Sequence, residues 1–303
     1  MCPLPKELSK RSRSVTVKTR RKVLLLAIAG VAVAIVLVFL YGDSRWTSRT
    51  KQLQGKIEVS RLRSLIRIYD PRELDGLPAP VQRYFRAVLK DGQRMVEAVT
   101  VEHSGTFNLG ETADEWKPFT SRERVITNRP GFVWDARVAM RRGLTVRVHD
   151  AYVGGEGILH ASLFGLFSLV DLHGTPEVAQ GELMRFLAEA AWYPTALLPS
   201  QGVRWEAVDD TSAKATLTDG EITVTLLFRF NDEGLIESAY AEARGRTVEG
   251  RVLPTPWEGR WGYYELRGGM HIPIEGEVAW LTPEGRKPYW RGRITNVTYE
   301  FAR

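Results

Sequence analysis

Three charged residues interrupt an otherwise apolar segment, GELMRFLAEAAWYPTALLPS, at residues 181–200. Glu182, Arg185 and Glu189 stand three and four positions apart, the spacing at which side chains on one face of a helix form ion pairs. Two carboxylates so placed could act as a general acid and base, but a further group must then shift their pKa, and the sequence shows none nearby. We therefore predict a structural stripe of exposed pairs, each stabilising the helix by about 0.2–0.5 kcal/mol.

A second group of chemically capable residues lies in VHDAYVGGEG, residues 148–157, where His149, Asp150 and Glu156 could hold a metal ion or perform acid–base catalysis. In a strand, however, His149 and Asp150 point to opposite faces, and the nearby glycines are typical of a hairpin or a bulge. The chain also carries no HExxH, GxSxG, P-loop or strand-linked GxGxxG pattern. We predict no metal, no cofactor and no catalytic residue, and an enzyme without a readable motif remains an alternative.

Charge is distributed unevenly along the 303 residues. Residues 1–22 hold eight of the 42 basic side chains and one of the 36 acidic ones, so the other 281 residues carry 34 basic and 35 acidic groups. The net charge of +6 therefore belongs to a short tail, and the rest of the chain has no electrostatic footprint for a polyanion. We expect no nucleic-acid partner, and the hydrophobic content of 44% excludes a disordered chain.

Directly after the basic tail, residues 23–41 (VLLLAIAGVAVAIVLVFLY) contain no charged side chain. At about 1.5 Å per residue this stretch approaches the ~30 Å hydrocarbon thickness of a bilayer, and it exceeds the roughly 7–15 apolar residues of a cleaved signal peptide. It also ends in the bulky residues Phe39, Leu40 and Tyr41, which disfavour cleavage. Because the basic residues precede it, we predict an uncleaved single-pass anchor in the cell membrane, with a cytoplasmic N-terminus.

Four segments follow from these boundaries: a cytoplasmic tail (1–22), the transmembrane helix (23–41), a stalk (42–76) and an extracytoplasmic domain (77–303). The only cysteine, Cys2, lies in the tail. The domain can therefore contain neither a disulfide nor a thiolate metal site.

Apolar residues alternate with polar ones through most of the domain from residue 95 onward, which predicts strands. In EITVTLLFRF, for example, alternate residues from Ile222 to Phe230 share an apolar face. Turn signals such as Asn231–Gly234 recur at short intervals and favour antiparallel hairpins. The predicted strands span residues 95–107, 119–127, 132–140, 144–153, 156–163, 203–208, 212–218, 222–230, 235–245, 259–267, 272–281 and 288–301.

Two helices interrupt the strand pattern. Residues 77–92 predict a short packing helix, and residues 176–192 predict a long one that Thr175 caps and Pro194 limits. The long helix is apolar over most of its circumference, so it must be buried on most sides. We therefore predict an α+β, β-rich fold in which a curved antiparallel sheet surrounds this helix, a half-barrel similar in architecture to lipoprotein-carrier domains.

Aromatic residues concentrate in the same domain, because all nine tryptophans and 28 of the 30 aromatic residues follow residue 41. Ordinary packing in strands is one interpretation. The other is an apolar cavity whose indole and phenol groups hold the polar end of an amphiphile. The candidate lining residues are Trp134, Trp192, Tyr193, Trp205, Phe228, Trp261 and Trp280.

Two further expectations concern this cavity. Trp192 should close the end of the long helix against Trp134 and Trp205, which lie on the apolar faces of their predicted strands. The run ILHASLFGLFSLVDL, residues 158–172, should form either a buried hairpin or an apolar lid near the membrane.

Several strings of the domain together resemble an uncharacterised bacterial family, a domain of unknown function. The resemblance covers about residues 77–301. It implies no catalytic residue, because no activity is assigned to that family. The strings are WKPF (116–119), PGFVWDAR (130–137), WYPTALLPS (192–200), IPIEGEVAW (272–280) and YWRG (289–292).

The leading functional hypothesis is a membrane-anchored extracytoplasmic domain that binds a lipid or another apolar envelope component without chemistry. The alternatives are a structural or regulatory interaction protein, in which the long helix alone fills the curved sheet, and a hydrolase without a readable motif. An accessible cavity of several hundred Å³ beside the helix would favour ligand binding, since ligand pockets typically measure about 300–1,000 Å³. A buried carboxylate with a strongly raised pKa facing a cleft would favour the hydrolase.

Overall fold

The computed structural model describes residues 7–62, 65–110, 113–141, 143–248 and 251–303, with side chains from Arg21 onward. The chain divides into two compact units, Met1–Thr47 and Ser48–Arg303. Helix α1 (Glu7–Ser60) begins in the first unit and ends in the second. Cys2 lies outside the described residues.

The first unit contains the predicted membrane span. Within the described part of the chain, one helix is long and apolar enough to cross a membrane, and none of its apolar window is buried. The side chains of residues 23–41 are exposed, as a lipid-facing segment requires. A signal sequence would share these properties, so the anchor stays a prediction.

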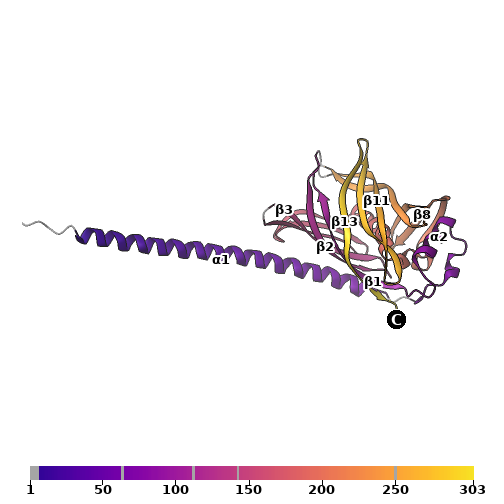
Figure 1. The fold of residues 1–303 in the computed structure, drawn as a ribbon, viewed down its shortest axis with the longest axis horizontal. Coiled ribbons are helices and arrows are strands. Elements are labelled where there is room, and N and C mark those ends of the chain that lie inside the picture. Colours follow the sequence, from indigo (N-terminus) through magenta and orange to yellow (C-terminus); the bar gives the residue numbers. More distant parts are fainter. Residues whose placement is uncertain (1–6, 63–64, 111–112, 142, 249–250) are drawn as a thin grey trace, which may run out of the picture. The chain divides into compact units, whose positions relative to one another are not determined.

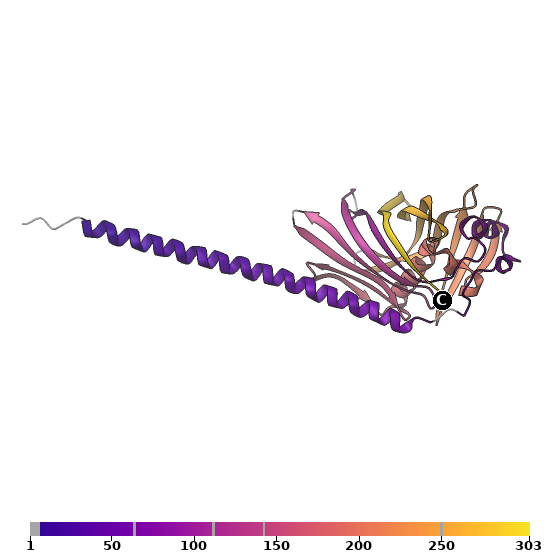
Figure 2. The ribbon, with the colours of Figure 1, turned by 60° about the horizontal axis from the view of Figure 1, so that its bottom comes forward.

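The second unit is built on one antiparallel sheet of thirteen strands (Figures 1 and 2). Two runs of hairpins, β1 to β6 and β7 to β13, meet where β1 pairs with β13, so the first and last strands lie at the centre. The predicted β-rich, antiparallel fold is confirmed. The strands are β1 (Val96–Asn108), β2 (Trp116–Ile126), β3 (Gly131–Arg141), β4 (Leu144–Val153), β5 (Glu156–Leu163), β6 (Phe167–His173), β7 (Arg204–Asp209), β8 (Ser212–Asp219), β9 (Ile222–Phe230), β10 (Ile236–Val248), β11 (Arg251–Arg267), β12 (Met270–Thr282) and β13 (Gly285–Phe301).

Glycines at the centre of the sheet allow tryptophan rings to lie against the backbone. Gly105, Gly292 and Gly276 are directly paired across β1, β13 and β12. A Cβ atom at Gly276 would lie 2.6 Å from the Trp261 ring, and one at Gly292 would overlap the Trp290 ring. Such glycines permit close approach and bending, which fits the curvature of these strands in Figure 2.

The predicted long helix is α3 (Pro176–Glu189), and it contacts strands of both hairpin runs: β4, β5 and β6 on one side, β9 and β10 on the other. Thr175 caps its start by accepting a hydrogen bond from the Val178 N–H at 3.4 Å. After Glu189 the chain continues in short 3₁₀ turns, η2 (Ala190–Trp192), η3 (Pro194–Leu197) and η4 (Pro199–Gln201). The sheet therefore curves around α3, as the apolar circumference of the helix predicted.

The other helical segments close one end of the sheet. The 3₁₀ turn η1 (Pro71–Leu74) precedes α2 (Ala79–Val88), which contacts β8 and β12. The apolar positions expected to pack, Val81, Tyr84, Phe85 and Val88, are all buried.

A second, smaller core covers the opposite face of the sheet. Leu53 and Ile57 of α1 are buried in a cluster with β-strand residues such as Val133 and Ala151. The Thr50 hydroxyl also lies 2.7 Å from the His149 Nε2 atom. Residues 48–60, expected to be part of a stalk, therefore belong to the compact unit.

Strand β6 was not predicted as a strand. It pairs with β5, so the run 158–172 does form a hairpin. Its Phe167 and Leu169 side chains are 63% and 56% exposed, however, so the expected burial of this hairpin is wrong for β6. An edge strand has a sheet neighbour on one side only, which explains the exposure. Its role as a lid near the membrane stays a prediction.

Candidate functional site

The charged stripe of α3 is buried, so the prediction of exposed pairs is wrong. Glu182 and Glu189 are 6% and 9% exposed. Arg185 donates from Nε to Glu189 Oε1 at 2.8 Å, from Nη1 to Asp150 Oδ2 at 2.5 Å and from Nη2 to Glu123 Oε1 at 3.4 Å. The polar face of α3 is therefore turned toward β2 and β4 instead of solvent.

A second arginine, Arg244 of β10, lies on the same side of the sheet. Its Nη2 atom is 3.6 Å from Glu182 Oε1, and its Nη1 atom donates to the Tyr289 hydroxyl at 3.4 Å. The guanidinium carbon lies 5.1 Å from the Trp257 ring centroid and 6.0 Å from that of Trp280. Arg185 is placed in the same way over Phe132 and Trp134 at 4.9 and 5.1 Å. Aromatic faces thus stabilise both cations.

The four acids around these arginines form two pairs. Glu123 lies beside Glu189, and Glu182 beside Asp150, close enough for each neighbour to raise the pKa of Glu123 and of Glu182. A carboxylate only accepts hydrogen bonds, so two adjacent carboxyl groups can bond to each other when one proton is held between them. Within the described residues, one oxygen of each acid has no hydrogen-bond partner, and one proton shared within each pair would satisfy all four. Two protonated acids and two carboxylates then balance two arginines, which leaves the buried cluster neutral.

Burial explains why these protons are retained. Removal from water raises the pKa of Glu123 and Glu182 well above the usual glutamate value, and the neighbouring carboxylates raise it further. The pKa of Glu189 is also raised by burial, although Arg185 opposes that shift. A neutral carboxylic acid costs far less to bury than an unpaired carboxylate.

This arrangement predicts an unusual pH dependence of stability. A raised folded-state pKa means that the folded protein binds more protons than the unfolded chain, so the contribution is complete below the unfolded pKa and is lost as pH rises through the folded pKa. Above pH 7, and as far as the folded-state pKa, we expect the free energy of unfolding to fall by up to about 1.4 kcal/mol per pH unit for each such proton. Buried His103 and His149, whose pKa is lowered to about 3 by burial, do not contribute in this range.

Chemical denaturation between pH 7 and 9 checks this expectation. Glu123→Gln, which mimics the protonated acid, should flatten the fall, whereas Glu233→Gln at an exposed turn should follow wild type. A wild-type stability that stays constant or rises across this range would show that the shared protons are absent.

Two adjacent hollows lie beside this cluster, between α3 and the sheet. The inner cavity has a volume of about 90 Å³ and the outer hollow about 600 Å³, and both are lined by Phe107, Asp150, Leu159, Arg244 and Tyr289. Five tryptophans also line the inner cavity: Trp134, Trp192, Trp257, Trp261 and Trp290. Among the described residues, the buried indole N–H groups of Trp134, Trp192 and Trp261 have no hydrogen-bond acceptor. Donors without acceptors beside a cavity fit a ligand that brings acceptor atoms.

Of the seven predicted lining residues, four line one of the two hollows and three do not. Trp134, Trp192 and Trp261 line the inner cavity, and Trp280 lines the outer hollow. The remaining three, Tyr193, Trp205 and Phe228, are packed in the core.

Hydrogen bonds and ring contacts explain the positions of these three core residues. The Tyr193 hydroxyl donates to the Phe186 carbonyl, and the Trp205 indole donates to the Leu197 carbonyl, each at 2.9 Å. The rings of Trp205 and Phe228 lie 5.3 Å apart. These polar groups are satisfied by the backbone and leave nothing for a ligand.

Of the two predicted partners of Trp192, Trp134 lines the same inner cavity, whereas Trp205 packs against Phe228 in the core. The ring of Trp192 makes contacts with those of His103 at 4.7 Å and Trp261 at 5.3 Å. The helix ends near the glycine-rich centre of the sheet, where β1 and β11 provide these rings. The predicted lining residues also omit Arg244, Trp257 and Tyr289. Trp257 could have been included, because alternation along β11 places it on the same face as Trp261.

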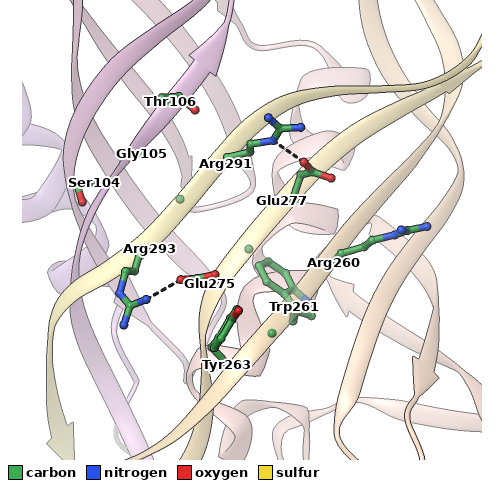
Figure 3. A pocket seen from close by; sticks show the side chains of 13 residues that line it. Ser104, Gly105, Thr106, Arg260, Trp261, Tyr263, Glu275, Glu277, Arg291 and Arg293 are labelled. Atoms are coloured by element: carbon green, nitrogen blue, oxygen red, sulfur yellow. Dashed lines mark hydrogen bonds and ion pairs between the residues drawn. The ribbon is translucent and has the colours of Figure 1, made fainter.

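A third hollow of about 480 Å³ lies over the same central strands (Figure 3). Arg291 and Arg293 line it, and they alternate along β13 with Trp290 and Gly292, so they point away from the inner cavity. Figure 3 shows that Arg291 is paired with Glu277 and Arg293 with Glu275, each at 2.5 Å. This face is a surface of mutually neutralised charges, so we do not place the ligand there.

Two solved structures share some of this architecture. A LolA superfamily protein from Nitrosomonas europaea is 12% identical, with a TM-score of 0.38 over 74% of this chain and 94% of that chain. A beta-barrel-like protein of a domain of unknown function, DUF1849, from Brucella abortus is also 12% identical, with a TM-score of 0.21 over 68% of this chain and 99% of that chain. Neither likeness is close enough to transfer a ligand or an activity.

Sequence comparison gives a clearer result. No curated protein matches the chain. Residues 75–299, most of the second unit, match one family model. The chain belongs to the Family of unknown function (DUF6920).

Proposed function

We propose that the domain binds an amphiphilic ligand, a lipid or another apolar envelope component, between α3 and the sheet. The observation that carries this proposal is the tryptophan-lined inner cavity with unpaired indole donors, adjacent to a hollow of about 600 Å³. That volume lies within the usual range of roughly 300–1,000 Å³ for small-molecule sites. An apolar chain would gain about 0.8 kcal/mol for each CH₂ group removed from water.

We further propose that the apolar part of α1 anchors the domain in the cell membrane with the domain outside the cytoplasm. The excess of basic residues in positions 1–22 supports this orientation. An anchored binding domain would stay close to the membrane from which an amphiphile is extracted. Protease added to spheroplasts should therefore digest the domain, and complete protection would contradict the orientation.

A second candidate function is hydrolysis, favoured by one specific observation. Asp150 and Glu182 share a proton and both line the outer hollow, so one could activate water while the other protonates a leaving group. Structural networks also shift pKa values, and the arginines account for the charges here without a reaction. Asp150→Asn and Glu182→Gln should therefore leave amphiphile binding in place, whereas either would abolish ester hydrolysis.

Filling the hollow tests the binding function. Leu159 lines both the inner cavity and the outer hollow, so Leu159→Trp should exclude a ligand, whereas Leu266→Trp at a 63% exposed position should not. Native mass spectrometry of the full chain, released from its membrane in mild detergent, should show a bound amphiphile on wild type and Leu266→Trp only. Equal adducts on all three proteins would place the ligand elsewhere.

A further inference from the structure

Arg244 is held much more loosely than Arg185. Its contacts to Glu182 and Tyr289 measure 3.6 and 3.4 Å, whereas Arg185 makes contacts of 2.5 and 2.8 Å to Asp150 and Glu189. A close guanidinium–carboxylate pair measures about 2.7–2.9 Å. Arg244 nevertheless lines both the inner cavity and the outer hollow, and its side chain is 10% exposed.

The acid nearest to Arg244 does not neutralise it. Glu182 is the protonated member of its pair with Asp150, because burial and the Asp150 carboxylate raise its pKa well above the usual value. The other Asp150 oxygen is occupied by Arg185. The two carboxylates of the cluster therefore face Arg185, and Arg244 faces an uncharged acid.

Tyr289 adds a second donor at the same place. Its hydroxyl accepts hydrogen bonds from the Trp257 indole at 2.9 Å and from Arg244. A phenol has two acceptor sites and one donor, so the two lone pairs are used and the O–H remains to donate. Within the described residues, no acceptor faces that O–H.

The surroundings of the outer hollow also favour negative charge. Of its basic lining residues, Arg286 is paired with Glu258 and Glu277, and Lys287 with Glu284, so Arg246 is the cation that adds to Arg244. The basic residues are Arg244, Arg246, Arg286 and Lys287, and the acidic ones are Asp114, Asp150 and Glu182. The rings of Trp257 and Trp280 flank Arg244 and provide apolar walls for the first carbons beside a charged group.

We infer that the outer hollow receives the anionic head group, a carboxylate or a phosphate, of an amphiphile, with Arg244 and Tyr289 donating hydrogen bonds to it. This inference rests on the proposed function. A guanidinium matches the oxygens of either anion with two parallel N–H donors. The first carbons of the apolar chain would lie beside Arg244, against the rings of Trp257 and Trp280.

Binding should then weaken as pH rises. Glu182 faces Asp150 of β4, Arg185 of its own helix and Arg244 of β10, with the Glu123–Glu189 pair beyond Arg185. When Glu182 loses its proton, its carboxylate competes with the ligand for Arg244. Glu182→Gln cannot ionise, so its affinity for octanoate should vary less with pH between 6 and 9 than that of wild type.

Eight-carbon probes test the head group on the full chain in nanodiscs of zwitterionic lipid. Octanoate and octyl phosphate should bind wild type more tightly than octanol or octylammonium. Arg244→Gln should weaken octanoate by about tenfold to a hundredfold, the usual value of a charged hydrogen bond, and should change octanol by less than about twofold. Arg229→Gln, on an exposed position of β9, is the matched control.

Three results would overturn the inference in distinguishable ways. If octanol or octylammonium binds as tightly as octanoate, the head-group assignment is wrong while the proposed function stands. If inorganic phosphate binds as tightly as octyl phosphate, Arg244 belongs to a free-anion site. If none of the probes binds wild type, the proposed function fails with it.

Discussion

Replacing Arg185 by methionine should destabilise the protein by about 3–5 kcal/mol, the usual cost of removing one partner from a buried ion-pair network. Methionine occupies a similar volume but leaves the carboxyl groups of Glu123, Asp150 and Glu189 without their shared cation. Loss of the guanidinium over Phe132 and Trp134 adds to the effect. Denaturant unfolding of the full chain at pH 7.5 measures the change.

Arg204→Met is the matched control, because the Arg204 side chain is 72% exposed and its pair with Glu206 should contribute less than about 1 kcal/mol. The loss of stability in Arg185→Met should also become smaller as pH falls toward 5, since the carboxylates that no longer face a cation can then take up protons. Equal effects of the two substitutions would show that the cluster is solvated instead of buried.

Replacing Trp192 by alanine should have an effect of similar size, about 3–5 kcal/mol, as large-to-small substitutions in a core do. The Trp192 side chain is 2% exposed and lies against His103 and Trp261. Because it also lines the inner cavity, added lipid extract should raise the thermal midpoint of wild type more than that of the variant.

Tyr263→Ala is the control for Trp192→Ala, since Tyr263 is 73% exposed. It should keep both the stability and the lipid effect of wild type. Should Trp192→Ala behave like Tyr263→Ala in both measurements, neither the packing of Trp192 nor its place beside a ligand would hold.

Most strands could be predicted from the sequence because a strand with one buried face alternates apolar and polar residues. Alternating residues from Ile222 to Phe230 had to separate an apolar from a polar face, and β9 does so. The burial of α3 followed from its apolar circumference in the same way. Strand β6 escaped prediction because its apolar residues fall on both faces at a sheet edge, where no core imposes alternation.

The charged cluster could not be predicted because its members are distant in sequence. Asp150 and Glu123 stand 35 and 62 positions from Arg185, and only the sheet brings them to α3. A register shift between Ala241 and Arg244 also breaks the alternation of β10 and turns Arg244 to the inner side. Local periodicity carries no information about either event.

Native mass spectrometry of the full chain, purified from its own membrane, tests ligand binding in the outer hollow between α3 and the sheet most directly. The binding account predicts one amphiphile per wild-type protein, released on organic extraction and identified as an anionic lipid. The same ligand should be retained by Leu266→Trp and lost from Leu159→Trp. The intact mass should also include residues 1–41. Bare wild-type protein that takes up nothing from an added lipid extract would contradict the account and leave α3 as the only occupant of the sheet.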